Sequence, residues 1–381
     1  MHTSTERILT THVGSLPRSK AVTDVVFALE RGETVDDGEA VIAHAVDEVV
    51  ARQVRTGLDV VSDGEMSKIS YATYIKDRIS GFDGDSQRDP PSDLQEYPGF
   101  LERQAKSGGT PTYRRPCCVG DIAVKNMQPV KTDIANLNAA TAAHEAREGF
   151  MNAASPGVIA LFQPNKHYDN HSAYLEALAD AMRHEYRAIV EAGVVLQIDS
   201  PDLGLGRHML FKDESDEAYL ALATQHVEAL NYALEGLPPE QVRLHVCWGN
   251  YEGPHHHDAP MSMVLPIALR ANVGALLFES SNPRHAHEWT TFAEVTLPED
   301  LILVPGVIDS TTNFIEHPEL VAQRIEQFAN IVGRERVIAG ADCGFSTFAG
   351  FGAVDPEIAY AKLGSLVEGA RIASERLWGG A

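Results

Sequence analysis

Short apolar runs and helical segments alternate along most of this sequence. The apolar runs, each followed by polar residues, lie at 7–16, 58–62, 158–162, 194–199, 242–247, 275–279, 301–308 and 337–341. Segments with helical spacing lie at 36–56, 174–191, 217–234 and 318–331. In the first of these, Val41, Ala45 and Val49 recur every four residues, and Gly57 follows where a C-cap glycine belongs. Continuous apolar strands that alternate with helices are typical of a parallel sheet.

Eight predicted strands, each running into a polar loop, indicate an α/β fold, a closed (β/α)8 TIM barrel. An excursion follows the second strand, because residues 81–112 are rich in Gly, Pro, Ser, Asp and Gln and are too long for a plain connection. The strand-like stretch at 114–124, which contains Cys117 and Cys118, is interpreted as part of a hairpin in this excursion. We therefore expect one barrel domain over 1–381 with an insertion at about 81–125.

Residues of metal-ligand type end three of the predicted strands. His245 and Cys247 stand two apart, so their side chains face the same way, and Cys343 follows the last strand at the same mouth. Imidazole and thiolate are ligands that zinc prefers, and Glu279 adds a carboxylate whose burial requires a partner. We predict that these four residues bind Zn²⁺. The alternatives are a core histidine beside a buried thiol, and Glu279 paired with Arg284.

Other polar residues at strand ends are expected to face the same pocket. Glu65 and Asp199 are interpreted as substrate contacts, and Ser15 and Asp309 join them at the mouth. The alternative for the two carboxylates is an ion pair that stabilises the loops. The three histidines at 255–257 lie in a loop with Gly and Pro, which favours a solvated loop over a second metal site.

Charge and composition exclude several classes of partner. The formal net charge is −23 and Lys and Arg are not clustered, which argues against nucleic acid. No apolar run approaches the ~18 residues needed to span a bilayer, and the amino terminus lacks a basic region followed by an apolar one. We therefore expect a cytoplasmic protein without a membrane partner. The four cysteines suggest reduced metal ligands or buried side chains rather than disulfides.

The predicted ligand set favours one kind of chemistry. A zinc ion with two thiolates, a histidine and a carboxylate has little Lewis acidity for activating water, but it can exchange or add a ligand. A substrate thiol bound there would lose its proton and remain a nucleophile at neutral pH. The expected reaction is therefore alkyl transfer to sulfur. Two alternatives of other classes are a glycoside hydrolase-like barrel that uses Glu65 and Asp199, and a non-catalytic zinc protein.

Seven motifs carry a resemblance to a known family. They are Thr-Thr-His-Val-Gly-Ser-Leu-Pro-Arg at 10–18, Asp-Gly-Glu at 63–65, Gln-Ile-Asp-Ser-Pro at 197–201, His-Val-Cys at 245–247, Phe-Glu-Ser at 278–280, Pro-Gly-Val-Ile-Asp at 305–309 and Ala-Asp-Cys-Gly at 341–344. In this order they resemble the carboxyl-terminal barrel of cobalamin-independent methionine synthase. The chain resembles more closely that family's single-barrel relatives, which include the epoxyalkane:coenzyme M transferases.

The resemblance implies roles for individual residues. Residues that match the family's zinc ligands are His245, Cys247, Glu279 and Cys343. Residues that match the positions holding the amino acid part of homocysteine are Ser15, Glu65 and Asp199. The chain departs from methionine synthase in a longer stretch after Cys247, in Thr311 where that enzyme has histidine, and at 154–164 in the folate region. These departures resemble the coenzyme M transferase group.

The main prediction is therefore a zinc-dependent S-alkyltransferase similar to epoxyalkane:coenzyme M transferase. The alternative is methyl transfer to homocysteine from a methyl-folate or methyl-corrinoid donor. Coenzyme M carries a sulfonate, which Asp199 and Glu65 would repel unless Arg18 or Arg207 offset them. For an epoxide, His12 or one of the histidines at 255–257, His255 among them, is expected to donate a proton to the opening ring. The oligomeric state stays open, with a homo-oligomer as one option.

Overall fold

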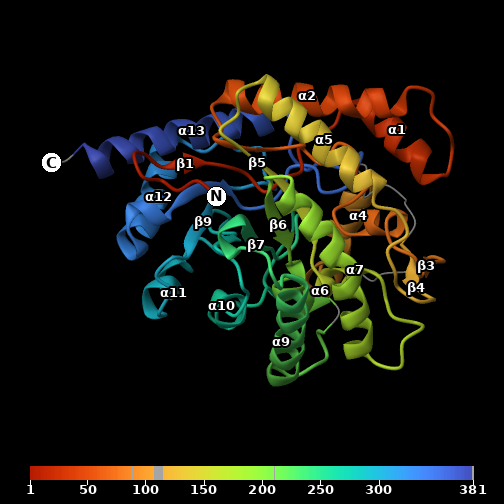
Figure 1. Cartoon of the computed structure of the whole chain (residues 1–381). Helices are drawn as coiled ribbons and strands as arrows, with labels where there is room; N and C mark the ends of the chain where they lie inside the picture. Colours follow the sequence, from red (N-terminus) through yellow and green to blue (C-terminus); the bar gives the residue numbers. More distant parts are fainter. Residues whose placement is uncertain (87–89, 107–114, 210, 380–381) are drawn as a thin grey trace.

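Eight parallel strands form a nearly closed barrel in the computed structural model, which describes residues 1–86, 90–106, 115–209 and 211–379 (Figure 1). Around the barrel the strands follow in the order β1 (Leu9–Thr10), β10 (Ile338–Ala341), β9 (Ile302–Ile308), β8 (Ala275–Phe278), β7 (Val242–Val246), β6 (Val195–Asp199), β5 (Glu148–Ala154) and β2 (Val60–Ser62). Between the two end strands of this order, the Asp59 amide donates to the Thr10 carbonyl over 3.1 Å. The α/β barrel prediction is confirmed.

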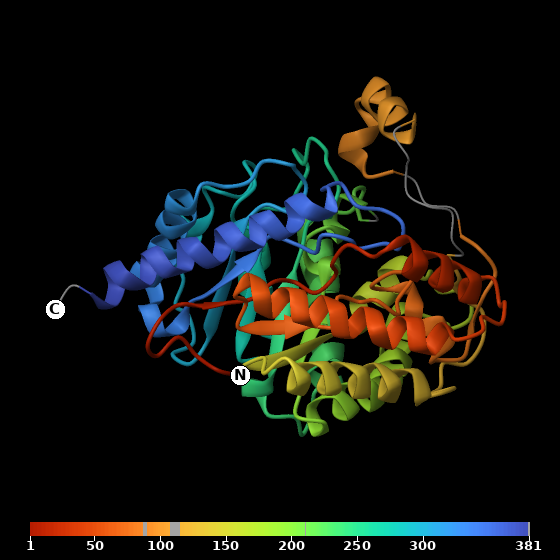
Figure 2. The same ribbon diagram turned by 90° about the horizontal axis from the view of Figure 1, so that it is seen from above.

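Helices surround the strands, as the two ribbon views show (Figures 1 and 2). The longer ones are α1 (Lys20–Glu30), α2 (Gly38–Thr56), α5 (Gln128–Ala143), α7 (His171–Glu191), α9 (Asp216–Ala233), α12 (Pro318–Val332) and α13 (Pro356–Trp378). Shorter ones are α6 (Pro156–Phe162), α8 (Gly206–Met209), α10 (Met261–Ala268) and α11 (Trp289–Glu294), with 3-10 turns at Thr73–Asp77, Pro201–Leu203, Pro239–Gln241 and Arg334–Arg336. The four predicted helices are confirmed, and Gly57 ends α2 at a φ of 98°.

Alternate strand residues point into the barrel, and this alternation aims the site residues. Leu244 and Val246 of β7 belong to the large core between sheet and helices. Arg243 and His245 alternate with them and therefore face inward. The Arg243 side chain is fully buried inside, where it donates to Gln197 Oε1 over 2.9 Å and lies 3.7 Å above the Phe150 ring. His245 therefore sits one layer nearer the carboxyl-terminal mouth than this buried arginine.

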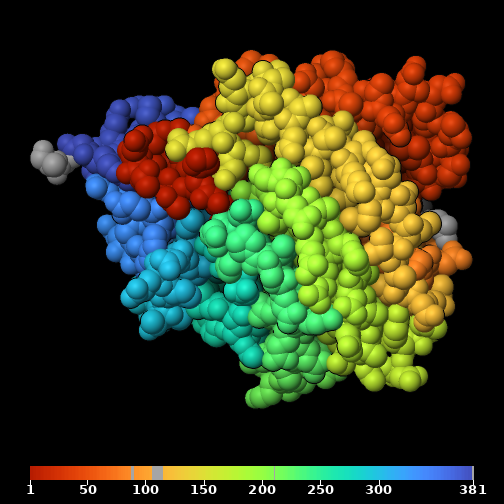
Figure 3. Space-filling view, viewed as in Figure 1, coloured from red at the N-terminus to blue at the C-terminus, as the bar shows by residue number. Residues whose placement is uncertain are grey.

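The amino-terminal end of the barrel is closed by the start of the chain, coloured red in Figure 3. Met1 packs against two apolar clusters, one of which contains Leu277 of β8 and the other Phe150 of β5. Its amino group donates to the Glu240 carbonyl over 2.8 Å, just before β7 begins. The start of the chain therefore covers this end of the barrel, opposite the carboxyl-terminal mouth.

The predicted strand at 158–162 is wrong. This stretch is helix α6, and the strand is β5, which lies just before it. Ser155 begins the helix because its hydroxyl accepts a hydrogen bond from the Val158 amide over 2.9 Å, and Pro156 follows at the first helical position. The helix is apolar on all sides because all of its residues except Ala160 are buried, so it lacks the helical periodicity that distinguishes a helix from a buried strand.

The insertion after β2 contains the predicted hairpin. Strand β3 (Phe82–Asp83) pairs antiparallel with β4 (Cys117–Cys118), and the predicted strand's first residue, at 114, lies outside the described residues. Helices α3 (Ser92–Gln95) and α4 (Pro98–Lys106) project beyond the ring of helices in Figure 2. Among the described residues, no helix is both long enough and apolar enough to cross a membrane.

Candidate metal centre and substrate cavity

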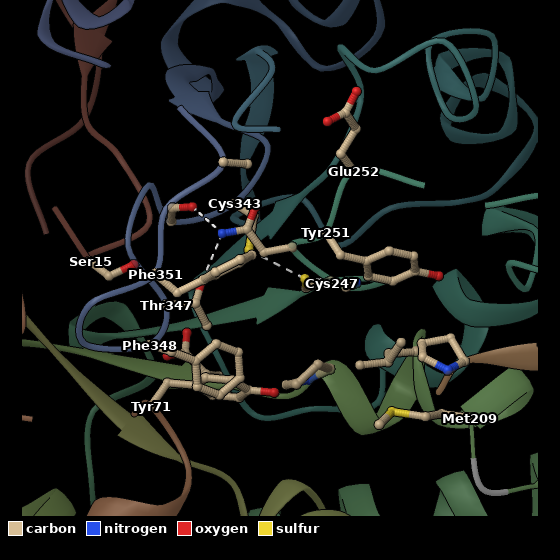
Figure 4. A pocket seen from close by; sticks show the side chains of 18 of the residues that line it. Ser15, Tyr71, Met209, Cys247, Tyr251, Glu252, Cys343, Thr347, Phe348 and Phe351 are labelled. Atoms are coloured by element: carbon tan, nitrogen blue, oxygen red, sulfur yellow. Dashed lines mark hydrogen bonds between the residues drawn. The ribbon is translucent and has the colours of Figure 1, made fainter. Parts of the chain in front are cut away.

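Three metal-type donors converge at the carboxyl-terminal mouth of the barrel. His245 is the penultimate residue of β7 and lies on its inner face, Cys247 follows two residues later, and Cys343 follows β10. The two Sγ atoms are 3.3 Å apart, and donor atoms of all three residues lie within 4.8 Å of one another. All three side chains are buried, and Figure 4 shows both cysteines at the same wall.

The hydrogen bonds of His245 leave one ring nitrogen available for a metal. Its Nδ1 lies 3.1 Å from Asp199 Oδ1, whereas its Nε2 is buried without a hydrogen-bond partner among the described residues. Burial would lower the pKa of His245, but the hydrogen bond and charge of Asp199 outweigh burial and raise it. A carboxylate that holds Nδ1–H turns the Nε2 lone pair toward the two sulfurs, as in many zinc sites. The donor set therefore fits zinc.

Glu279 lies beside this group, but its oxygens are held by loops. Oε1 accepts a hydrogen bond from the Trp248 amide over 2.8 Å, and Oε2 accepts one from Asn282 Nδ2 over 2.7 Å. Burial and the neighbouring Cys247 raise the pKa of Glu279 well above its ordinary value. The alternative partner, Arg284, donates instead to the His256 carbonyl. Glu279 thus lies beside the three convergent donors but is not part of the group whose donor atoms lie within 4.8 Å of one another.

A cavity of about 620 Å³ opens above the three donors. Its inner end is lined by Ser15, Glu65, Asp199, His245, Cys247 and Cys343. Its outer walls carry aromatic and aliphatic side chains, namely Tyr71, Phe162, Leu205, Met209, Phe348 and Phe351, together with Leu94 and Leu101 of the insertion. Figure 4 shows Tyr71 and Phe348 side by side across the cavity from the cysteines, and their ring centroids are 6.0 Å apart. The cavity therefore joins a polar, acidic end to a largely apolar outer part, whose wall also includes Arg115 and Glu252.

Glu65 is held in a strained position at the acidic end. Its backbone φ is 58°, a left-handed value that costs free energy for any residue except glycine. Arg18 holds this turn by donating to the carbonyls of Glu65 and Lys68. Burial raises the pKa of Glu65 to about 7, the charge of Lys68 opposes this shift, and Asp199 adds to it. Its Oε2 is buried with no hydrogen-bond partner in the described part of the chain.

Asp199 is more fully bonded than Glu65. Its Oδ2 accepts a hydrogen bond from Asn152 Nδ2 over 2.8 Å, and its Oδ1 accepts one from Gln197 Nε2 over 2.9 Å as well as facing His245. Sequence reasoning missed Asn152 because β5 was not recognised as a strand. Alternation along β5, with Phe150 inside the barrel, would have placed Asn152 inside too.

Ser15 lies at the same end, close to the loop after β10. A Cβ atom added to Gly344 would lie 2.0 Å from Ser15 Oγ, so that the glycine permits the approach of the two loops. Among the described residues, the Ser15 hydroxyl accepts one long hydrogen bond, of 3.4 Å, from the Ser346 amide. Of the expected substrate contacts, the cavity thus brings together Ser15, Glu65 and Asp199.

Three other predicted residues do not line the cavity. His12 is fully buried, with Nε2 2.7 Å from Gln53 Oε1, and burial lowers its pKa to about 4. Asp309 accepts hydrogen bonds from the amides of Thr311 and Thr312 and so holds its own loop. His255 is bonded through both nitrogens, to Asp258 and to the Tyr251 carbonyl, each over 2.9 Å. The structure gives these residues positions that support loops.

Fold and site together define a class of protein, a (β/α)8 barrel whose mouth carries a histidine and two cysteines suited to zinc. Comparison with known proteins identifies the family. The family model of the cobalamin-independent synthase catalytic domain matches residues 8–370, and the chain belongs to this family. The prediction of an enzyme from the cobalamin-independent methionine synthase superfamily is confirmed.

Individual relatives extend the comparison over nearly the whole chain. A methionine synthase from Saccharolobus solfataricus is 26% identical over 372 residues, which are 97% of this chain and 95% of the relative. One from Saccharolobus islandicus is 28% identical over 374 residues, with the same coverage. The structure of a B12-independent methionine synthase from Shewanella in complex with selenomethionine superposes with a TM-score of 0.71 at 20% identity, over 98% of this chain and 99% of that one. This last similarity concerns the fold.

Proposed function

We propose that this protein is a zinc-dependent methyltransferase that transfers a methyl group to the sulfur of homocysteine. Two observations carry the proposal: the unpartnered His245 Nε2 beside two buried thiols, and the two carboxylates at the inner end of the same cavity. The methionine synthases among its relatives support the same acceptor. The epoxyalkane:coenzyme M transferase prediction finds less support in these observations, and the methionine synthase alternative becomes our main proposal.

The charges at the inner end of the cavity favour an amino acid over a sulfonate. Glu65 and Asp199 suit an ammonium group and would repel the sulfonate of coenzyme M. The charge of Arg18 acts on Glu65, but its guanidinium donates to the carbonyls of Glu65, Lys68 and Ser346 and so is not free to bind a sulfonate. Arg207 bonds Asp216 and the Phe211 carbonyl. Homocysteine supplies an ammonium for the acidic end and a thiol for the donors beside it.

The metal ligands we propose are His245, Cys247 and Cys343, with Glu279 as the fourth. Zinc, when bound, would hold the substrate sulfur and lower the pKa of its thiol, so that the thiol is ionised at neutral pH. Asp199 keeps the proton on His245 Nδ1 and so leaves Nε2 free to bind. We also propose that residues 1–381 form one barrel domain with the insertion at about 81–125.

Side chains of the protein position homocysteine and the methyl donor. Glu65, once ionised, would pair with the substrate ammonium and fill the place at its unpartnered Oε2. Ser15 can hydrogen-bond the amino acid portion of the substrate. The largely apolar outer part of the cavity, including Tyr71 and Phe348, excludes water from the reacting sulfur and holds the methyl donor against it. The methyl group passes to sulfur as its bond to the donor breaks, and the electron pair of that bond stays with the donor. The thiol loses its proton to solvent when it ionises, and a methyl-folate donor takes up one proton on the nitrogen that loses the methyl group.

Turnover assays with defined pairs of substrates test this proposal. Zinc-loaded protein is incubated with homocysteine and either methyltetrahydrofolate or methylcobalamin, and separately with coenzyme M and an epoxyalkane. Methionine formation supports the proposal, whereas turnover with the epoxide pair alone refutes it. The variant Cys247→Ser should lose bound zinc and methyl transfer together, whereas Cys118→Ser, at a buried free thiol of the hairpin, should keep both.

Zinc-edge X-ray absorption supplies a readout independent of turnover. We expect an additional sulfur neighbour when homocysteine is added and no such change with coenzyme M. A non-catalytic zinc site would keep the same coordination with either thiol. A glycoside hydrolase would retain its activity after chelation and after the Cys247→Ser change, so the same preparations exclude both alternatives.

A further inference from the structure

A second group of metal-type donors lies at the rim of the barrel mouth. His256 and His257 stand in the loop after β7, and Glu96 follows α3 in the insertion, about 160 positions earlier in the chain. His256 Nε2 lies 2.9 Å from Glu96 Oε2, and His257 Nε2 lies 2.5 Å from Glu96 Oε1. Donor atoms of the three residues lie within 4.8 Å of one another. The sequence interpretation of a solvated loop did not include this carboxylate.

The loop is built so that two consecutive histidines reach one point. His255 adopts a φ of 53°, and its amide donates to Asp93 Oδ2 over 2.9 Å. Its ring Nδ1 lies 2.9 Å from Asp258 Oδ2, which fixes the orientation of the ring. The rings of His256 and His257 consequently lie on the same side, with centroids 4.1 Å apart, instead of alternating as they would along a strand. The two imidazoles are pre-positioned before any ion binds.

The same three residues remain open to solvent. Relative side-chain exposure is 32% for His256, 39% for His257 and 52% for Glu96, so an ion can enter from outside without passing through the cavity. Two imidazole nitrogens and one carboxylate are a ligand set for zinc with one open position, and not one for Mg²⁺ or Ca²⁺, which prefer oxygen.

We propose that Glu96, His256 and His257 form a second Zn²⁺ site, which fastens the insertion to the loop after β7. Both segments wall the cavity, the insertion through residues such as Leu94 and the loop through Tyr251. They already touch where Tyr251 Oη donates to Asp93 Oδ2 over 2.8 Å. An ion at the rim therefore stabilises the outer wall of the cavity, and its role is structural and distinct from that of the inner donors.

Zinc titration of the full chain, stripped of metal, tests the proposal. Wild-type protein should bind about two equivalents, whereas His256→Ala/His257→Ala and Cys247→Ser/Cys343→Ser should each bind about one. The control is His144→Ala, at a part-buried pair in which one imidazole faces one carboxylate, Asp47, over 2.8 Å. It should leave both equivalents in place. Glu96→Gln should weaken the outer equivalent about tenfold or more, and it replaces the double-alanine variant if that variant does not fold.

Coordination and protection distinguish the outer site from adventitious binding. In Cys247→Ser/Cys343→Ser protein, X-ray absorption should show zinc with nitrogen and oxygen neighbours and no sulfur. In the same protein, zinc should slow hydrogen exchange in α3 and α4, and the added histidine changes should abolish this effect. The proposal is overturned if the second equivalent survives His256→Ala/His257→Ala, or if zinc leaves exchange in these helices unchanged.

Discussion

Replacing Glu65 with glutamine separates the recognition of an ammonium group from the chemistry at sulfur. The carboxyl group is 2% exposed, its Oε2 has no partner among the described residues, and burial raises its pKa to about 7. The neutral form is therefore favoured in the folded protein at acidic pH. An arriving ammonium requires the ionised form, so binding of an amino acid must release the proton of Glu65 below pH 7.

The expected magnitude follows from this pKa. The shift from 4.5 to about 7 corresponds to about 3 kcal/mol, which favours the neutral carboxyl. This contribution to the free energy of unfolding is complete below the unfolded pKa near 4.5 and disappears as pH rises to about 7. The fraction of protein with ionised Glu65 grows from roughly 0.1 at pH 6 to roughly 0.9 at pH 8. The affinity for a ligand that binds this ionised form should therefore rise about tenfold.

Methionine is the ligand for this assay, because it carries the same ammonium and carboxylate as homocysteine but no thiol that ionises. Calorimetry in buffers of different ionisation enthalpy counts the protons released. Wild-type protein should release about one proton per methionine at pH 6 and almost none at pH 8. Glu65→Gln should release none at either pH, and Glu228→Gln, at an exposed surface ion pair, should behave as wild type. A flat wild-type profile, or proton release that persists in Glu65→Gln, refutes the reasoning.

Three further predictions concern stability and metal content. Ser155→Ala removes the hydroxyl that caps α6 through the Val158 amide and should lower the free energy of unfolding in urea by about 1–2 kcal/mol; an unchanged midpoint would contradict this role. Gly306→Ala should destabilise by about 3 kcal/mol or more, since its Cβ would meet the Asp342 backbone at 2.6 and 2.7 Å. Gly364→Ala, in a helix where an added Cβ meets nothing within 4 Å, should instead stabilise slightly, and thermal melts of the two glycine variants measure both changes. A chelator should abolish methyl transfer and zinc should restore it, whereas activity that resists removal of all metal would exclude a zinc enzyme.

The inner donors could be predicted because local periodicity determines their direction. His245 and Cys247 are two apart on a strand, and the pleat turns both inward regardless of the rest of the fold. Eight strands then bring Cys343 to the same mouth by closing the barrel. The apolar stretch at 158–162 could not be assigned in this way, because burial of all its residues except Ala160 removes the periodicity that separates a helix from a strand.

Other residues depended on contacts between distant segments. A histidine at 12 and an aspartate at 309 stand near strand ends, but Gln53 binds the first and the second bonds the turn that follows it. No local sequence pattern predicts that Glu96 lies beside the histidines at 256 and 257, because about 160 positions separate them.

The alternation of most strands with helices, the inward direction of alternate residues and the chemical types at the mouth follow from the sequence itself, since each depends on neighbours a few positions away. The packing of loops decided the rest: which ring nitrogen of His245 remains available, how far burial moves the pKa of Glu65, and which side chains cover the cavity. These properties depend on desolvation and on partners brought together by the closed barrel. The order of residue types along the sequence shows neither of them.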